Sequence, residues 1–206
     1  MDNLRDTYNK IAEEWHGDHQ SNDWWVPSTN TFISFLPTGA SVLDVGCGGG
    51  TKAKYLASRG LQVLGIDFSE NMIEIARREV PEAEFAVMDM RDLSELRRNF
   101  DGIFAQASLL HIPKKEVHSV FRKFLSHLKP NGYLYIAVKE KKEGQPDEEI
   151  QKESDYGYEY ERFFSFYAFD ELKQYFSDAD LEIVSENIIP SGKTRWITVI
   201  GRKREA

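Results

Sequence analysis

The stretch Val42-Leu-Asp-Val-Gly46-Cys-Gly48-Gly49-Gly50 narrows most strongly what this chain can fold into. A β-rich apolar run ends at its first glycine, and a segment with helical spacing begins after its last. Glycines permit a tight turn there, and they let a ligand approach the backbone more closely than a Cβ would allow. The stretch therefore predicts a strand, a ligand-binding turn and a helix, in that order.

The same alternation of apolar runs and helical segments continues to Val138. It predicts βαβ units and a parallel sheet, with strands at 41–45, 62–66, 84–87, 102–105 and 133–138. The clearest helix has its apolar residues between Val117 and Leu128 and ends at Lys129-Pro-Asn-Gly132, since proline cannot continue a helix. Ser69 predicts an N-cap, and Asp92 with Glu95 predicts a capping box for the helix that follows.

The segments outside this core have a different character. Residues 139–162 are rich in charge and tyrosine without an apolar period, which predicts a surface excursion or flexible cap. A helix is expected near 170–176, followed by strands at 181–189 and 194–202, whose short connection permits only an antiparallel hairpin. Residues 1–36 are expected to form two helices flanking a Trp-rich loop. The prediction is one α/β domain over 1–206, with parts at 1–36, 41–138, 139–167 and 168–206.

Composition limits the class of protein. With 206 residues, 41% of them hydrophobic, the chain can bury one sizeable core but is too short for two full domains with separate cores. No apolar run approaches the ~20 residues that span a bilayer. Because Cys47 is the only cysteine, an internal disulfide and a zinc site with paired cysteines are excluded, so no metal is expected and a reducing cytoplasm fits best. The net charge of -8 disfavours a nucleic-acid partner.

An acidic residue accompanies the glycine loop. Asp67 ends the second predicted strand, and in a doubly wound sheet that position lies beside the first strand's turn, where a carboxylate can accept hydrogen bonds from two ribose hydroxyls. It is expected at an exposed strand end. A nicotinamide fingerprint would have Gly or Ala where this chain has Thr51, and a P-loop would continue with Gly-Lys-Ser or Gly-Lys-Thr. Both ligand classes are therefore disfavoured.

Further motifs follow in order along the chain: Gly65-Ile-Asp-Phe-Ser-Glu-Asn-Met72, Met88-Asp-Met90, Phe100-Asp-Gly-Ile-Phe-Ala-Gln-Ala-Ser-Leu-Leu-His111 and Leu128-Lys-Pro-Asn-Gly132. With the glycine loop, they make the chain resemble the class I methyltransferases that use S-adenosylmethionine, of the small-molecule type 11 and type 25 kind. The resemblance extends from Tyr8 to the C-terminal hairpin. It implies a Rossmann-like methyltransferase fold, a seven-stranded mostly parallel sheet with a C-terminal antiparallel hairpin and helices on both faces.

The resemblance also implies a cofactor site for S-adenosylmethionine, with S-adenosylhomocysteine as product. The glycine loop is expected to line the methionyl and ribose parts, Asp67 to hold the ribose, and Gln106 to lie near the sulfonium or amino-acid end. Adenine is expected beside Phe68, with Asp89 accepting from its amino group and the Met90 backbone donating. The complete set of expected cofactor residues is Tyr8 and Trp15 (as a lid), Asp44, Gly46, Cys47, Gly48, Gly50, Asp67, Phe68, Asp89, Met90 and Gln106.

The chemistry beyond the cofactor is less defined. His111 is the best-placed general base for a hydroxyl or ammonium acceptor, and it is equally well interpreted as a structural loop residue. Caps of similar proteins imply acceptor contacts from Trp24, Trp25, Tyr158, Tyr160 and Arg162. The main interpretation is a small-molecule acceptor. The protein is expected to be a monomer or homodimer that does not bind a membrane. Two alternatives stay open: a nucleoside in tRNA, because 162–167 faintly resembles some tRNA wobble-uridine methyltransferases, and a non-catalytic cofactor-binding module.

Overall fold

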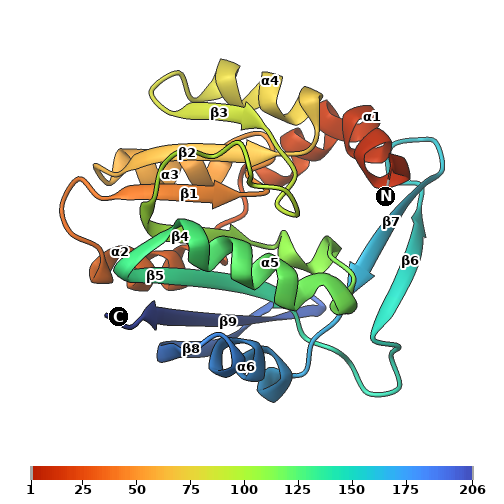
Figure 1. Ribbon diagram of the computed structural model, residues 1–206. Helices are drawn as coiled ribbons and strands as arrows, with labels where there is room; N and C mark the ends of the chain where they lie inside the picture. Colours follow the sequence, from red (N-terminus) through yellow and green to blue (C-terminus); the bar gives the residue numbers. More distant parts are fainter. Residues whose placement is uncertain (1, 206) are drawn as a thin grey trace.

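The computed structural model describes residues 2–205, with the side chain of Asp2 left aside, and its centre is a seven-stranded sheet (Figure 1). The strands lie in the order β3-β2-β1-β4-β5-β9-β8. The first five are parallel, whereas β9 is antiparallel to both β5 and β8. Their bounds are β1 Ser41–Val45, β2 Gln62–Asp67, β3 Glu84–Val87, β4 Phe100–Gln106, β5 Leu128–Lys139, β8 Leu181–Ser191 and β9 Thr194–Lys203. The predicted Rossmann-like α/β fold with a C-terminal antiparallel hairpin is confirmed.

Helices cover both faces of the sheet because successive strand residues point to opposite sides. Leu43 and Val45 of β1 belong to one apolar cluster with α5 (Lys114–His127) and α6 (Phe169–Asp178). Val42 belongs to another cluster, with α2 (Val26–Phe35), α3 (Thr51–Ser58) and α4 (Glu70–Glu79). Figure 1 shows α5 and α6 in front of the sheet. The sheet therefore separates two cores.

Two of the expected helix boundaries agree with the structure. Ser69 caps α4, since its Oγ accepts from the Met72 amide at 3.2 Å. α5 ends at His127, and Leu128 already begins β5, so the Lys129-Pro-Asn-Gly132 stretch lies within that strand. The residue with positive φ in that stretch is Asn131, at 60°, rather than Gly132. Gly132 is required for space instead, because a Cβ there would lie 2.9 Å from the carbonyl oxygen of Asp101.

The helix expected after Asp92 is wrong. Residues 92–99 form turns and irregular chain between β3 and β4. The Asp92 carboxylate accepts from the Ser94 amide at 3.1 Å, two residues on, which is an Asx turn and not a helix cap. Leu93 and Leu96 are buried although this segment forms no helix.

Residues 139–162 contain more structure than their sequence predicts. β6 (Glu148–Glu153) pairs antiparallel with β7 (Tyr160–Ser165) to form a separate two-stranded sheet. The sequence does not predict β6, because its apolar residue faces outward and its polar residues face inward: Ile150 is 63% exposed, while the polar residues beside it are half-buried. The expectation of an irregular excursion is therefore corrected to a β-hairpin.

α1 (Asp2–His19) and this hairpin lie together at one end of the molecule (Figure 1). The parallel strands point toward them, so they cover the carboxyl ends of those strands. The Thr7 hydroxyl of α1 donates to the Glu161 carbonyl of β7 at 3.0 Å, which joins the two segments. Among the described residues, no helix is both long and apolar enough to cross a membrane.

Candidate active site

A cavity of about 330 Å³ lies at the carboxyl ends of β1, β2, β4 and β5. β1 and β4 are neighbours although a crossover separates them in sequence, so the strand order reverses at this point. Open α/β sheets bind ligands at such a switch point. The 3₁₀ turn η1 (Leu109–His111), α1 and β7 supply further walls.

The glycine loop forms the floor of the cavity. Gly46 has φ of 70°, and a Cβ there would lie 2.4 Å from Cβ of Ser108 on the loop after β4. Gly49 is equally constrained, since its Cβ would lie 2.2 Å from Nδ1 of the buried His16. Gly50 does not reach the cavity; it caps α3 and packs against Ala76 of α4. The backbone of Gly46–Gly49 is thus the part available to a ligand.

Asp67 links this loop to the end of β2. One carboxylate oxygen accepts from the Gly48 amide at 3.0 Å and the other from the Ser69 amide at 2.9 Å. The side chain is buried, and burial raises its pKa to about 6 even though both amides favour the charged form. The expectation of an exposed strand end is corrected: Asp67 lines the cavity and also holds the glycine loop in shape.

Three buried polar atoms of cavity-lining residues lack a hydrogen-bond partner among the described residues: Asp44 Oδ2, Gln106 Nε2 and Trp15 Nε1. Buried polar groups are normally paired. Burial raises the Asp44 pKa to about 7, and the nearby Lys52 opposes that shift. The cavity therefore fits a ligand that carries hydrogen-bond donors, an acceptor and positive charge.

A smaller pocket of about 250 Å³ shares Phe68, Met90 and His111 with the cavity. Asp89 lies here, outside the larger cavity. Both of its oxygens accept from the Arg91 side chain, and the Arg91 amide donates to Oδ1 at 2.8 Å. An adenine amino group would therefore share this carboxylate with Arg91.

His111, the last residue of η1, is buried against α1 and β7, and both its ring nitrogens are engaged. Nδ1 lies 2.7 Å from the carbonyl oxygen of Phe163, which only accepts, so Nδ1 carries the proton and donates. Nε2 consequently accepts from the Tyr8 hydroxyl at 2.8 Å. That hydroxyl also accepts from Arg162 at 3.4 Å. Burial lowers the His111 pKa to about 3, so the imidazole is neutral at pH 7.

The outer part of the cavity is aromatic and cationic. Trp24 stacks on Trp196 of β9, with ring centroids 4.3 Å apart. Lys139 at the end of β5 lies over the ring of Phe164, 3.9 Å from its centroid. Arg162 lies over the same ring at 5.1 Å. All five side chains line the cavity.

The structure brings most of the expected residues together at this cavity. They are Tyr8, Trp15, Trp24, Asp44, Gly46, Cys47, Gly48, Asp67, Phe68, Met90, Gln106, His111 and Arg162. Three expected acceptor contacts lie elsewhere. Trp25 is buried against Tyr55, Tyr160 packs in the cluster under α1, and the Tyr158 ring lies under Lys10.

Several lining residues were not expected from the sequence. Lys139 ends a parallel strand, so the rule that pointed to Asp67 would also have found it. Trp196 carried no such signal, because the β8–β9 hairpin reaches the site only through its pairing with β5. The sequence shows Gly49 as one more glycine of the loop but gives no sign that this position needs glycine, because the side chain that excludes a Cβ there, His16, comes from a distant segment.

The chain is similar to known methyltransferases. Residues 42–132 match the family model described as a methyltransferase domain. A ubiquinone biosynthesis O-methyltransferase of Xanthomonas axonopodis is 35% identical over 107 residues, 50% of this chain and 44% of that protein. A phosphoethanolamine N-methyltransferase of Zea mays is 36% identical over 145 residues, 67% of this chain and 28% of that protein. The chain thus spans less than half the length of these two relatives.

A solved structure shares the fold across nearly the whole chain. It is the Burkholderia thailandensis 1,6-didemethyltoxoflavin-N1-methyltransferase, with a TM-score of 0.77 at 19% identity, covering 98% of this chain and 88% of that one. Its crystals hold 1,6-didemethyltoxoflavin and S-adenosylhomocysteine. Residues 42–132, which carry the glycine loop and Asp67, are thus similar to a methyltransferase domain, and the chain shares the fold of this S-adenosylhomocysteine-bound methyltransferase.

Proposed function

We propose that this protein transfers a methyl group from S-adenosylmethionine to a small-molecule acceptor. The observation that carries the proposal is the cavity at the switch point, where Asp67 joins the glycine loop and Asp44 and Gln106 have unpaired polar atoms. The named relatives methylate oxygen or nitrogen of small molecules, which supports the same class of reaction.

The residues present fit the cofactor's parts. The glycine loop at Gly46–Gly49 lets a ligand approach the backbone closely, and the Asp67 carboxylate suits the ribose, whose hydroxyls donate. Asp44 and Gln106 offer an acceptor and a donor for the ammonium and carboxylate of the methionyl end. Phe68 and Met90, shared with the smaller pocket, suit adenine, with Asp89 as the acceptor for its amino group. Tyr8 and Trp15 cover the site from α1.

The cofactor, when bound, supplies a methyl group already activated by its sulfonium. The protein's task is then to align the acceptor and exclude water. The α1 helix and β7 cover the cavity and serve both tasks, since the Tyr8 hydroxyl and the Arg162 side chain join these two elements by a hydrogen bond. His111 serves this closure, because a neutral imidazole whose nitrogens are both engaged and whose pKa is about 3 is a poor base at pH 7.

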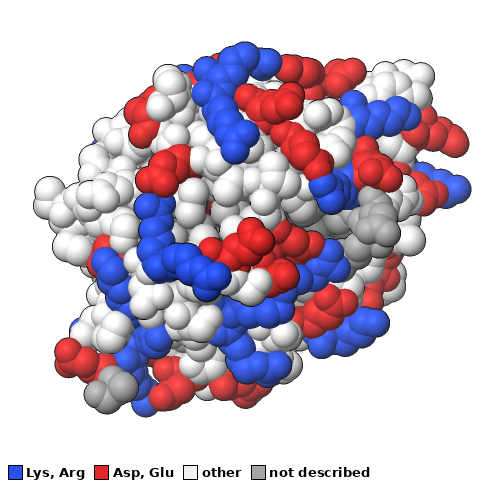
Figure 2. Space-filling model, turned by 45° about the horizontal axis from the view of Figure 1, so that its top comes forward, with Lys and Arg blue, Asp and Glu red and all other residues white. Residues whose placement is uncertain are grey.

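We also propose a domain division, a compartment and an oligomeric state for the chain. One methyltransferase domain comprises an N-terminal lid at 1–36, a cofactor core at 41–138, a cap at 139–167 and a C-terminal part at 168–206. The single cysteine favours the cytoplasm, for a monomer or homodimer. Basic and acidic side chains are interspersed on the face shown in Figure 2, which favours a small acceptor over tRNA.

The test has two steps. Calorimetry should show binding of S-adenosylmethionine and S-adenosylhomocysteine but not of NAD, and a preference for NAD would refute the proposal. Metabolite extracts and bulk tRNA are then incubated with a labelled methyl donor and analysed by mass spectrometry. A labelled metabolite is expected; a labelled tRNA would select the nucleoside alternative, and cofactor binding without transfer would select the non-catalytic one.

A further inference from the structure

Lys139 is a cation without an anionic partner in the cavity. It is the last residue of β5, directly opposite Trp196 in the β5–β9 register, and its ammonium lies over the Phe164 ring, 3.9 Å from the centroid. Within the described chain, no carboxylate oxygen lies within salt-bridge distance of its ammonium, and no side chain or carbonyl accepts a hydrogen bond from it. Half-buried lysines usually have a partner or reach solvent. This one faces a cavity instead.

Among the described residues, the surrounding charges leave the Lys139 ammonium without an ion pair. Arg162 lies on the same Phe164 ring, but its guanidinium is already bound by Glu153 through Nε and Nη2. Glu149 and Lys142 also act on Lys139, and Glu149, like Glu153, forms no ion pair with its ammonium. Burial, followed by Arg162, lowers the Lys139 pKa to about 8, so the ammonium is still mostly protonated at pH 7.

The cofactor end of the cavity has a cation of its own. Lys52 of α3 acts on Asp44 in β1, two strands away from β5 in the sheet order. Neighbouring strands are about 4.8 Å apart, so the two lysines belong to regions separated by roughly 10 Å. Lys139 therefore lies on the side of the aromatic pair Trp24 and Trp196, where nothing in the cofactor assignment needs a positive charge.

We propose that Lys139, with Arg162 beside it, binds an anionic group of the methyl acceptor, a carboxylate or a phosphate. The proposal rests on the methyltransferase function and names the class of acceptor. An anion here pairs with the ammonium and gives it the hydrogen bonds that it lacks, and charge-assisted hydrogen bonds are the strong ones. The Trp24–Trp196 stack then provides an apolar wall for the rest of the acceptor.

The experiment uses protein saturated with S-adenosylhomocysteine, titrated with inorganic phosphate or with acetate. The readout is the indole N–H signals in a ¹H–¹⁵N spectrum, since the chain has only 4 tryptophans. Trp196 and Trp24 should shift, and Trp25, buried outside the cavity, should not. Lys139→Met should weaken the anion by about ten- to a hundredfold, because a hydrogen bond to a charged group is lost. Lys139→Arg should keep binding.

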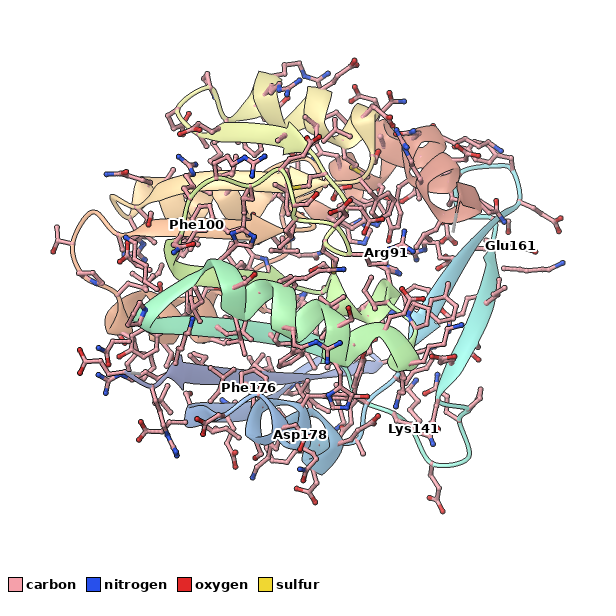
Figure 3. All side chains as sticks on the ribbon, viewed as in Figure 1. Arg91, Phe100, Lys141, Glu161, Phe176 and Asp178 are labelled. Carbon is pink, nitrogen blue, oxygen red and sulfur yellow. The ribbon has the colours of Figure 1, made fainter. Side chains whose placement is uncertain are left out.

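The matched control is Lys141→Met, which removes a lysine two residues on, paired with Asp147 and located on the loop after β5 (Figure 3). It should bind as the parent does. A response to phosphate alone would indicate a phosphorylated acceptor, and a response to acetate alone a carboxylate. The proposal would be overturned if neither anion shifts the tryptophan signals, or if Lys139→Met binds the anion as tightly as the parent does. It would also be overturned if Lys139→Met lost affinity for S-adenosylhomocysteine. Failure of the parent to bind S-adenosylhomocysteine would instead refute the proposed function on which it rests.

Discussion

The two halves of the cavity are built in different ways. The cofactor half is made by strand ends and a glycine loop, which Asp67 joins to its own strand end through the Gly48 and Ser69 amides. The cap half is made by side chains from distant segments, as when Tyr8 of α1 meets His111 and Arg162. The residues of the cofactor half can therefore be recognised largely from motifs along the chain, whereas those of the cap half are brought together only by contacts between distant segments.

The largest predicted difference between the two halves follows from replacing one glycine in each half by alanine, which adds the same methyl group to both. Gly46→Ala puts a Cβ at φ 70° and 2.4 Å from Cβ of Ser108, whereas Gly157→Ala in the cap has φ 81° and nothing within 4 Å. Gly157→Ala should lower the free energy of unfolding by about 1–2 kcal/mol, the cost of left-handed backbone. Gly46→Ala should cost about 3 kcal/mol or more, because overpacking adds to it.

Urea unfolding and calorimetry measure both effects. Gly46→Ala should also lose detectable binding of S-adenosylhomocysteine, and Gly157→Ala should retain it. Equal destabilisation by the two substitutions, or tight binding by Gly46→Ala, would mean that the loop adapts and that the two halves do not differ in rigidity.

The second prediction concerns pH, and it belongs to the cofactor half alone. Burial raises the pKa of Asp44 to about 7 and of Asp67 to about 6, both from 3.8. Folding then favours the protonated forms, so their contribution to stability is present below about pH 4 and is lost as the pH rises through 6 to 7. Ribose hydroxyls and a ligand ammonium favour the ionised forms. Affinity for S-adenosylmethionine should therefore increase about tenfold or more over that same rise.

Calorimetry in buffers of different ionisation enthalpy should show proton release on binding near pH 6. Asp67→Asn keeps an acceptor for the Gly48 amide but cannot ionise, so it should flatten the lower part of the profile. A parent affinity that is independent of pH, with no proton release, would contradict the assignment of both carboxylates.

The predictability of the fold differs between the same two halves. The β1 and β3 ranges were predicted to the residue, because each has an apolar run with a sharp polar boundary. The helix after Asp92 was wrong, because an Asx turn offers the same side chain another amide two residues on. The β6–β7 hairpin was missed, because Ile150 faces outward and inverts the expected pattern.

The site shows the same division. The glycine loop and Asp67 follow from topology, which places consecutive parallel strand ends side by side. Lys139 was within reach of that rule, since it ends β5. Trp196 and the Tyr8–His111 contact were not, because both depend on how the hairpin of β8 and β9 or the helix α1 packs onto the sheet. No spacing within the sequence encodes such packing.

The smallest predicted effect tests whether Tyr8 joins the cap to the core. Tyr8→Phe removes the hydroxyl that donates to the buried His111 Nε2 at 2.8 Å and accepts from Arg162. An unpaired buried nitrogen costs about 1–3 kcal/mol, and movement of α1 relieves part of it, so we expect a loss of about 1 kcal/mol in unfolding free energy. Tyr158→Phe is the control, because its hydroxyl makes only a long contact of 3.4 Å with the Lys10 carbonyl, and it should change stability by less than about 0.5 kcal/mol. Hydrogen exchange should speed up in α1 for Tyr8→Phe and stay unchanged in β1, since the loss is confined to the cap. Equal exchange in α1 for the two variants would show that apolar packing under α1, and not this hydroxyl, holds the cap closed.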